Sequence, residues 1–546
     1  MDSYAASLNV GNALPSGTIS TMRSYFKAAA LAVPLALTAV AAGAAPLVTP
    51  MQQAVAQAAS ADEAIAAFYR GRDFAPIWMG EGAEHRRAAF LWALDTAPDH
   101  GLPVGRYDPD TIRAEFAAAR TAADRGALEV EMTRRFLRYA QDVSSGIVDP
   151  RRVDPTIKVT VPKHDWLEQI TAFAEGDPYA FVRSLWPTTP AYTRLLREKL
   201  RLRGIQDAGG WGPPVSVGGL SLGDSGPAVV ELRNRLIRMG YLRRSAVASF
   251  DAALESAVRE FQIDHGLTPD GTVGEATLRA LNVPLEDRMA QIVVGLERQR
   301  WMNKPLEPRH ILVNLAEQHA YVVDDGKVTF DTVVVVGADT PDRRTPEFSD
   351  TMTHMVINPY WHVPRSIAIN EYLPALRRGG AQHLEVYSRT GRVNRANVNF
   401  SQYTASNFPF SLKQAPGPRN ALGRVKFMFP NQWNIYLHDT PSRNLFARDV
   451  RTFSHGCVRV ARPLALAYHL LAPQTETPKA DFDSVLAAGR ERRVNLEDPI
   501  GVHLVYWSAW VTPMGRANYR GDPYGRDAKL LSALRAAGVE LAGGRS

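Results

Sequence analysis

The chain has 546 residues, of which 45% are hydrophobic and 22% charged, and its formal net charge is +7. This length indicates about three or four domains, and the apolar content is sufficient for real cores, which excludes a wholly disordered chain. The modest basic excess fits an anionic envelope surface, acidic substrates or nucleic acid. No nucleic-acid-binding motif accompanies it, so we expect no nucleic-acid partner. Cys457 is the only cysteine, which excludes an intramolecular disulfide framework and a thiolate-cage zinc site.

The first segment of the chain is typical of export. Met22, an alternative start, and the basic residues after it precede an alanine-rich apolar run over residues 28–48, as in a secretory signal. We expect a signal segment over residues 22–56, with A-x-A cleavage sites at 42–44 and 54–56. The run approaches the ~20 residues of a spanning helix, so an uncleaved membrane anchor is the alternative. Either way we expect an exported protein, located in the periplasm or cell envelope.

Residues 60–207 carry apolar side chains at three- and four-residue spacing, which predicts a helical region. The predicted helices are Ala61–Arg70, Glu84–Ala97, Pro109–Ala123 and Ala127–Val143. Tryptophans in this region could stack on sugars, but packing within a helical core is the favoured interpretation. These tryptophans are Trp78, Trp92, Trp166 and Trp186. No catalytic chemistry is predicted here.

A second module follows a glycine- and proline-rich linker. Its amphipathic pattern predicts three helices within residues 217–283. Asp251 and Asp270 are interpreted as helix-cap and turn residues, rather than as the paired carboxylates of a hydrolase. A connecting amphipathic helix is expected over Leu285–Trp301.

From His310 the hydrophobic period changes to two, which predicts strands. Strands are expected over residues 310–316, 319–323 and 328–336, with a hairpin turn at 324–326. The run Val333–Val336 is apolar on both faces and indicates a central core strand.

The β pattern breaks between about residues 365 and 414 and resumes afterwards. A helix over Ile367–Arg378 is followed by a polar stretch. Long insertions of this kind in compact domains are usually functional, so we interpret this one as a lid that excludes water. A late strand is expected over Val502–Val511, and helical structure beyond it.

The candidate site lies in Ile435–Arg462. Cys457 follows Ser454-His455-Gly456, and His438 lies upstream of it. A nearby imidazole can take the thiol proton and hold the thiolate as an ion pair. The alternative is an inert buried cysteine among satisfied core histidines. Because the thiol and both histidines lie where strands meet turns, chemistry is favoured. The amides of Gly456 and Cys457 would then face a developing oxyanion.

His438 followed by SHGCVR (Ser454–Arg459) closely resembles the signature of L,D-transpeptidases with the YkuD-type catalytic domain. Three further stretches resemble the large periplasmic subgroup: Ala415–Asn431, Asn358–Ala368 and His503–Trp510. Residues 60–207 resemble the scaffold domain of that subgroup, and 217–283 resemble the peptidoglycan-binding type 1 domain. Shorter members often have Asn where this chain has Arg459. This difference leaves the identity of the group that accepts the acyl chain undetermined.

The resemblance implies an α+β multidomain protein. Its expected parts are a helical N-terminal scaffold, a three-helix peptidoglycan-binding domain, and a mainly-β catalytic domain over residues 308–511. The catalytic domain would carry a partly helical capping insertion at about 365–414, and a C-terminal helical segment would cover 512–546.

The resemblance also implies the site roles. Cys457 would be the nucleophile and His438 the base, with Asp439 orienting the imidazole through its carbonyl or its carboxylate. The expected substrate-binding residues are Ser454, His455, Arg459, Tyr436 and Trp361. An ordinary salt bridge within the fold is the alternative role of Arg459. No metal or organic cofactor is expected.

The implied reaction begins with a thioester formed from a tetrapeptide stem, with release of D-alanine. An amine of an acceptor stem would give a 3→3 crosslink, a lipoprotein lysine would be attached to the wall, and water would give L,D-carboxypeptidase action. The wall-binding module and the lid favour crosslinking. A Cys/His endopeptidase and a non-catalytic wall-binding protein are the rival interpretations. We expect a monomer that carbapenems would label.

Overall fold

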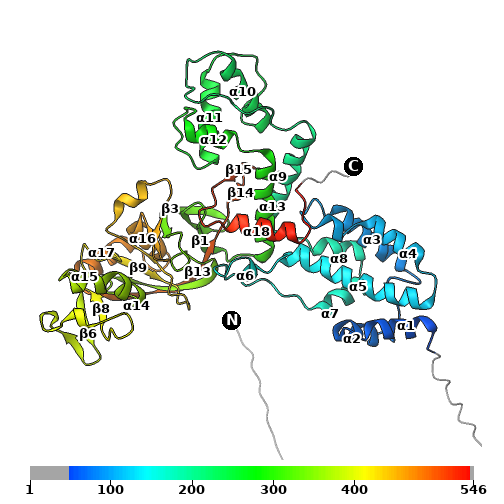
Figure 1. The fold of residues 1–546 in the computed structure, drawn as a ribbon, viewed down its shortest axis with the longest axis horizontal. Helices are drawn as coiled ribbons and strands as arrows, with labels where there is room; N and C mark the ends of the chain where they lie inside the picture. Colours follow the sequence, from blue (N-terminus) through cyan, green and yellow to red (C-terminus); the bar gives the residue numbers. More distant parts are fainter. Residues whose placement is uncertain (1–47, 542–546) are drawn as a thin grey trace, which may run out of the picture. The chain divides into compact units, whose positions relative to one another are not determined.

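The computed structural model describes residues 48–541 (Figure 1), and the described residues from Thr49 onward form one compact unit by their contacts. Residues 22–47 of the predicted signal segment lie outside the described residues. Within the described part of the chain, no helix combines the length and the apolar character needed to cross a membrane.

The scaffold region is helical, as predicted. Its helices are α1 (Pro50–Ala59), α2 (Glu63–Arg70), α3 (Ala83–Thr96), α4 (Pro109–Ala118), α5 (Ala122–Ser145), α6 (Pro150–Val153), α7 (Trp166–Glu175), α8 (Pro178–Ser184) and α9 (Pro190–Asp207). The predicted helix Pro109–Ala123 is too long, because Thr121 caps a new helix in a capping box with Asp124. Trp78 is fully buried with the rings of Phe90 and Phe136 5.4 and 5.8 Å away, which confirms core packing for this tryptophan.

Helix α1 overlaps the end of the predicted signal segment. Val55 and Ala59 are fully buried in the scaffold core. Gly126 of α5 permits this close approach, since a Cβ atom there would lie 2.4 Å from the Cβ atom of Ala54. Residues 50–56 therefore belong to the scaffold, and the predicted boundary at residue 56 falls inside a packed helix.

The second module contains the three expected helices, followed by the connecting helix. They are α10 (Pro227–Met239), α11 (Ala252–Asp264), α12 (Glu275–Leu281) and α13 (Leu285–Trp301). The Asp251 carboxylate accepts a hydrogen bond from the Leu254 amide, and that of Asp270 from the Thr272 amide. Both acids are thus cap and turn residues, as interpreted from the sequence.

The region that begins at Arg309 is built on a nine-stranded sheet with the order β11-β3-β12-β10-β9-β4-β13-β1-β2. Its strands are β1 (Arg309–Asn314), β2 (His319–Asp324), β3 (Lys327–Gly337), β4 (Phe348–Ile357), β9 (Val425–Met428), β10 (Leu437–His438), β11 (Thr452–Ser454), β12 (Val458–Val460) and β13 (Arg492–Val505). β3 also pairs with β2, so the sheet closes on itself. Val334, Val335 and Val336 are fully buried, which confirms the predicted core strand.

Helices and a hairpin complete this region. They are α16 (Pro463–Leu471), α17 (Pro478–Ala487), β14 (Ala509–Val511), β15 (Ala517–Tyr519) and α18 (Arg526–Ala536). The predicted late strand over Val502–Val511 is interrupted after Val505. The C-terminal segment is not helical throughout, because β15 first pairs with β14.

The capping insertion forms a small unit with its own core. Its strands are β5 (Trp361–His362), β6 (Glu385–Ser388), β7 (Gly391–Val393) and β8 (Ser411–Gln414), in the order β5-β8-β6-β7. Its helical turns are α14 (Arg365–Ile367), the π-helical turn η2 (Ala368–Tyr372), α15 (Leu373–Arg377), and the 3-10 turns η3 (Arg395–Asn397) and η4 (Phe400–Gln402). The polar stretch after the predicted helix thus contributes strands to a small sheet, where the sequence indicated a break in the β pattern. We call residues 361–414 the cap.

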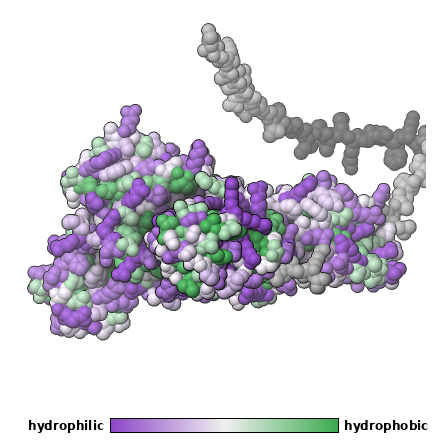
Figure 2. Space-filling model, turned by 90° about the horizontal axis from the view of Figure 1, so that it is seen from above, coloured by the Kyte–Doolittle hydropathy of each residue, from purple (hydrophilic) through white to green (hydrophobic). Residues whose placement is uncertain are grey.

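A buried ionic network joins three distant segments. Arg298 of α13 contacts Glu347, the residue before β4, at 2.6 Å, and Asp527 of α18 at 3.1 Å. Arg526 contacts the other oxygen of Glu347 at 3.1 Å. Because these charges are nearly inaccessible, each needs its partners. On the face seen in Figure 2, by contrast, hydrophilic residues cover most of the described surface.

Gly126→Ala should disrupt the contact between α1 and α5. The added methyl group would meet both side-chain and backbone atoms of Ala54 closer than 3 Å, and overpacking of this kind typically costs about 1–3 kcal/mol. Hydrogen exchange of residues 49–59, followed by mass spectrometry, should show faster exchange in the variant.

Gly204→Ala is the matched control, because a Cβ atom there meets nothing within 4 Å in helix α9. It should leave α1 unchanged and stabilise α9 slightly. Equal exchange of α1 in the two variants would contradict the packing described for Gly126.

Candidate active site

Two neighbouring strands, β10 and β12, place the candidate residues on one face of the sheet. β10 pairs in parallel with β12, so that His438 is opposite Arg459, and Leu437 is opposite Val458. Leu437 and Val458 are fully buried in the sheet core. Because side chains alternate between the two faces of a strand, Cys457 lies on the same face as His438 and Arg459.

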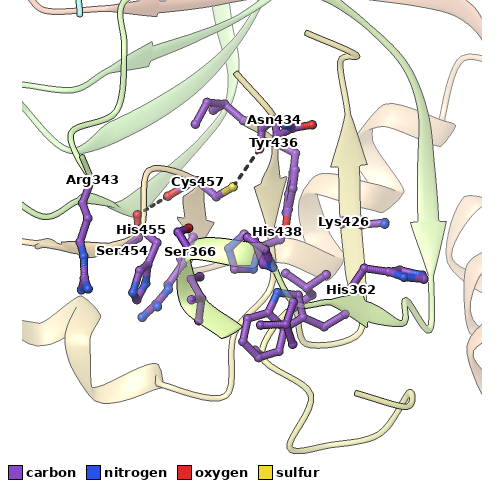
Figure 3. A pocket seen from close by; sticks show the side chains of 18 of the residues that line it. Arg343, His362, Ser366, Lys426, Asn434, Tyr436, His438, Ser454, His455 and Cys457 are labelled. Atoms are coloured by element: carbon purple, nitrogen blue, oxygen red, sulfur yellow. Dashed lines mark hydrogen bonds between the residues drawn. The ribbon is translucent and has the colours of Figure 1, made fainter. Parts of the chain in front are cut away.

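A cavity of about 640 Å³ covers this face. It is lined by both Cys457 and His438, by residues of the β3–β4 loop, and by the cap (Figure 3). All of the substrate-binding residues expected from the sequence line it as well: Ser454, His455, Arg459, Tyr436 and Trp361. The structure therefore brings Cys457, His438 and these residues together around one cavity.

The backbone of Asp439 orients the imidazole. His438 Nδ1 lies 2.5 Å from the carbonyl oxygen of Asp439. A carbonyl can only accept, so Nδ1 carries the proton and Nε2 is the free basic nitrogen. Of the two alternatives left open by the sequence, the carbonyl holds the ring.

The Asp439 carboxylate instead holds the surrounding loop. It accepts hydrogen bonds from the amides of Arg424 and Thr440 at 2.9 and 2.7 Å. Gly423 makes room for it, because a Cβ atom there would lie 2.3 Å from the Asp439 Cγ atom. Gly423 also has a φ of +60°, which favours glycine.

The thiol of Cys457 is half-buried and donates a hydrogen bond to the carbonyl of Asn434 at 3.5 Å (Figure 3). Among residues 48–541, no hydrogen bond joins the sulfur to His438. Asn434 has a φ of +54°, a conformation that asparagine tolerates. In this structure the thiol proton is directed at Asn434 and not at the imidazole.

Burial disfavours the charged forms of both Cys457 and His438. Burial raises the pKa of the Cys457 thiol to about 11, although hydrogen bonds from Tyr436 and the charges of Arg459 and Lys426 offset part of the effect. Burial, with the positive charge of Arg459, lowers the pKa of His438 to about 3. These shifts, together with the thiol hydrogen bond to Asn434, disfavour the standing thiolate–imidazolium pair considered from the sequence.

The turn before Cys457 is held from within. The Ser454 hydroxyl donates to the carbonyl of Cys457 at 2.5 Å and accepts from the Gly456 amide at 3.1 Å. Thr345 donates to the Gly456 carbonyl at 2.7 Å, and Arg526 donates to the Thr345 carbonyl at 2.8 Å. The ionic network of α13 and α18 thus reaches the catalytic turn.

These contacts bear on two expectations from the sequence. The Gly456 amide donates to Ser454 in this structure and is not free to face an oxyanion. The Ser454 hydroxyl is engaged within the turn, and its expected contact with a substrate stays a prediction. Within the described chain, no backbone hydrogen bond engages the Cys457 amide. Gly456 is still required by the turn, because its φ is +114° and Ile435 packs against it.

Arg459 is a half-buried cation without an acidic partner. In the described part of the chain it forms no ion pair, and its buried Nε atom has no hydrogen-bond partner. The ordinary salt bridge weighed from the sequence is thus absent from these residues. An unpaired guanidinium facing a cavity is suited to bind a carboxylate.

The cap is joined to the catalytic turn through Glu371, a residue that the sequence did not indicate. Glu371 Oε1 lies 2.5 Å from His455 Nε2 and 2.9 Å from Arg343 Nη2. Glu371 belongs to the π-helical turn η2, a conformation often found at functional sites. His455 therefore ties the cap to the turn that carries Cys457.

Two aromatic residues form part of the cavity wall. Tyr436 directly precedes β10, and its ring lies 5.7 Å from the ring of His438. Trp361 is 8% exposed and packs in the cap core against Tyr372.

Lys426 also lines the cavity. The alternating pattern of β9 placed Lys426 on the polar face, but only the pairing of β9 with β10 shows that this face is the site.

Known protein families match most of these regions. Residues 308–478 match the family described as "L,D-transpeptidase catalytic domain". Residues 63–200 match a "Scaffold domain", and residues 225–281 match a "Putative peptidoglycan binding domain".

Individual relatives match over shorter spans. The chain is similar to a "Putative L,D-transpeptidase" of Haemophilus influenzae, with 33% identity over 227 residues, covering 40% of this chain and 45% of that protein. It is similar to "N-acetylmuramoyl-L-alanine amidase CwlM" of Mycobacterium tuberculosis, with 46% identity over 72 residues, covering 11% of this chain and 18% of that protein. The chain thus spans less than half the length of these curated relatives.

A crystal structure of the L,D-transpeptidase of Xylanimonas cellulosilytica (residues 123–326) is 17% identical, with a TM-score of 0.16, and the match covers 54% of this chain and 100% of that one. The family matches and the conjunction of thiol, imidazole and turn lead to one conclusion. The chain contains a YkuD-type L,D-transpeptidase catalytic domain together with a peptidoglycan-binding domain.

Proposed function

We propose that this protein is an L,D-transpeptidase that forms 3→3 crosslinks between peptidoglycan stem peptides. One observation carries the proposal. A thiol and an imidazole with a free Nε2 nitrogen share one sheet face, inside a cavity that the cap partly covers. This arrangement supports acyl transfer through a thioester on Cys457.

The first half-reaction forms the thioester. His438 Nε2 takes the thiol proton as Sγ attacks the carbonyl carbon of the third residue of a tetrapeptide stem. The Cys457 amide donates to the resulting oxyanion. The intermediate collapses when the C–N bond breaks, and the imidazolium returns its proton to the nitrogen of the departing D-alanine.

The second half-reaction transfers the acyl group. An amine on the third residue of a neighbouring stem attacks the thioester carbonyl while His438 takes a proton from it. The thiolate leaves and regains that proton from the imidazolium. Arg459, which has no acidic partner among the described residues, binds a stem carboxylate and so helps to hold a peptide in place.

The cavities favour an amine acceptor over water. The cap contributes much of the wall around Cys457, which limits solvent access to the thioester. A second cavity of about 580 Å³ is lined by cap residues and by the loop after His438. The two cavities share Arg459 and Ala421, so two peptides have space to approach one centre.

We further propose that the protein acts in the periplasm after export, as a monomer. Since α1 is packed in the scaffold, cleavage at residues 42–44 keeps this helix, and cleavage at 54–56 would remove it. Retention of the segment as a membrane anchor is the alternative. The peptidoglycan-binding domain would hold the enzyme on its substrate.

Purified protein incubated with disaccharide-tetrapeptides should yield crosslinked dimers and D-alanine, detected by mass spectrometry. Cys457→Ala should abolish both products, because no other thiol exists in the chain. His438→Ala should lower the rate by about 10²–10⁴-fold, the usual contribution of a general base. His319→Ala, on β2 and hydrogen-bonded to Asp331, is the control and should leave the rate unchanged.

The products distinguish the rival functions. If the products contain tripeptide but no crosslinked dimer, the protein acts as an L,D-carboxypeptidase and not as a crosslinking enzyme. If the acyl group is found on a lipoprotein lysine, the acceptor is that lysine and not a second stem. Full activity of Cys457→Ala would refute the assigned nucleophile. Failure of the wild type both to release D-alanine and to form a carbapenem adduct would support a non-catalytic wall-binding protein.

Alkylation of the free enzyme by iodoacetamide should follow the raised pKa of the thiol. Because burial disfavours the thiolate, the rate should rise about tenfold per pH unit from neutrality and level off only near pH 11. Urea-unfolded protein, whose thiol titrates near pH 8.5, should react faster at about pH 8. A rate plateau between about pH 5 and pH 8 would instead indicate a standing thiolate–imidazolium pair.

Gly423→Ala should impair catalysis by displacing Asp439, whose carbonyl holds the His438 ring. We expect the transfer rate to fall tenfold or more. Gly489→Ala is the matched control, because Gly489 has a similar φ of +66° but open space around its Cβ position. Equal rates in the two variants would show that backbone strain alone, and not the Asp439 contact, explains any loss.

A further inference from the structure

Lys426 occupies the same face of the sheet as the reacting groups. It lies on β9 directly opposite His438 of β10. Its neighbours Val425 and Phe427 are fully buried in the sheet core. The alternation of the strand therefore turns Lys426 to the other side, and its side chain lines the cavity with Cys457.

Lys426 and Arg459 flank the base in one row across three strands. Arg459 is opposite His438 on one side, and Lys426 is opposite it on the other. Neighbouring strands lie about 4.8 Å apart, so the two cationic residues are separated by about 10 Å at their Cα atoms. Two positive charges thus face the site with a neutral imidazole between them.

No group in the described part of the chain neutralises the Lys426 ammonium. It has no hydrogen bond or ion pair there, although its side chain is half-buried. Burial lowers its pKa, and the charge of Glu491 opposes this only in part. The Glu491 carboxylate is engaged instead by the Tyr360 amide at 2.6 Å. An ammonium left unpaired in a partly buried site weakens the fold, and an anionic ligand would remove that penalty.

The position of Lys426 indicates which part of a ligand it meets. Cys457 and Lys426 lie on opposite sides of His438 in the view of Figure 3. In the proposed reaction, the scissile carbonyl is at Cys457 and the departing nitrogen is at His438. The carboxylate carbon of a C-terminal residue lies only about 2.5 Å beyond its own nitrogen. A donor peptide that runs from the Cys457 sulfur past the imidazole therefore directs its terminal carboxylate toward Lys426.

We propose that Lys426 binds the free C-terminal carboxylate of the residue that leaves, and so selects donor peptides that end one residue after the scissile bond. This inference rests on the proposed function. Arg459 is less suited to this task, because it lies on β12, which directly follows Cys457, and therefore on the acyl side of His438. Lys426 is thus a specificity-determining residue that contacts the departing end of the donor.

The test compares two donors that differ only in that group. One is the disaccharide-tetrapeptide with a free C-terminal carboxylate, and the other carries a C-terminal carboxamide. For the wild type, kcat/KM should favour the free acid by about tenfold to a hundredfold, as expected for a charge-assisted hydrogen bond in a partly buried site. D-alanine or D-alaninamide release is measured for each donor.

Lys426→Met should erase this preference by lowering kcat/KM for the free acid while leaving the amide donor nearly unchanged. Lys426→Arg keeps the charge and should retain most of the preference. Lys327→Met, at the exposed start of β3, is the matched control for loss of a lysine and should behave as the wild type. Thermal unfolding of each variant establishes that the fold is intact.

Three outcomes would overturn the proposal. If Lys426→Met lowers kcat/KM equally for both donors, Lys426 acts on the thiol or the base and not on the carboxylate. If Lys426→Met keeps the wild-type preference for the free acid, another residue binds the C-terminal carboxylate. In both cases the proposed transpeptidase function stands. A wild type that releases nothing from either donor would overturn that function, and this inference with it.

Discussion

The pairing of β10 with both β12 and β9 is the constraint on which the active site depends. It fixes His438 between Arg459 and Lys426, and it puts Cys457 on the same face. A shift of either pairing by one residue would turn these side chains into the hydrophobic core, where Leu437, Val458 and Phe427 now lie. The same alternation that builds the core therefore assembles the chemistry.

Burial sets the electrostatics of this face. A half-enclosed site disfavours charge on both the thiol and the imidazole, and the neighbouring cations lower the pKa of His438 further. The imidazole of His438 is thus favoured in its neutral form, with Nδ1 held by the Asp439 carbonyl and Nε2 free. The two unpaired cations are suited to a peptide that brings its own carboxylates.

Parts of the chain far from Cys457 hold it in position. The Gly456 carbonyl is held by Thr345, which is bound in turn by Arg526, and Arg526 shares Glu347 with Arg298 of α13. Glu371 ties His455 of the same turn to the cap. The catalytic turn is therefore fixed from the helical side and from the cap at once.

Local patterns in the sequence determined the helices, the strands and the site motif, because hydrophobic period and turn residues act over a few positions. Lys426, the carbonyl role of Asp439 and the internal role of Ser454 were decided only by the tertiary structure. So was the small sheet within the cap, since its polar strands carry no clear alternation. Strand pairing joins residues that are distant in the chain, and the direction in which a backbone carbonyl or hydroxyl points follows from that pairing rather than from the residue type.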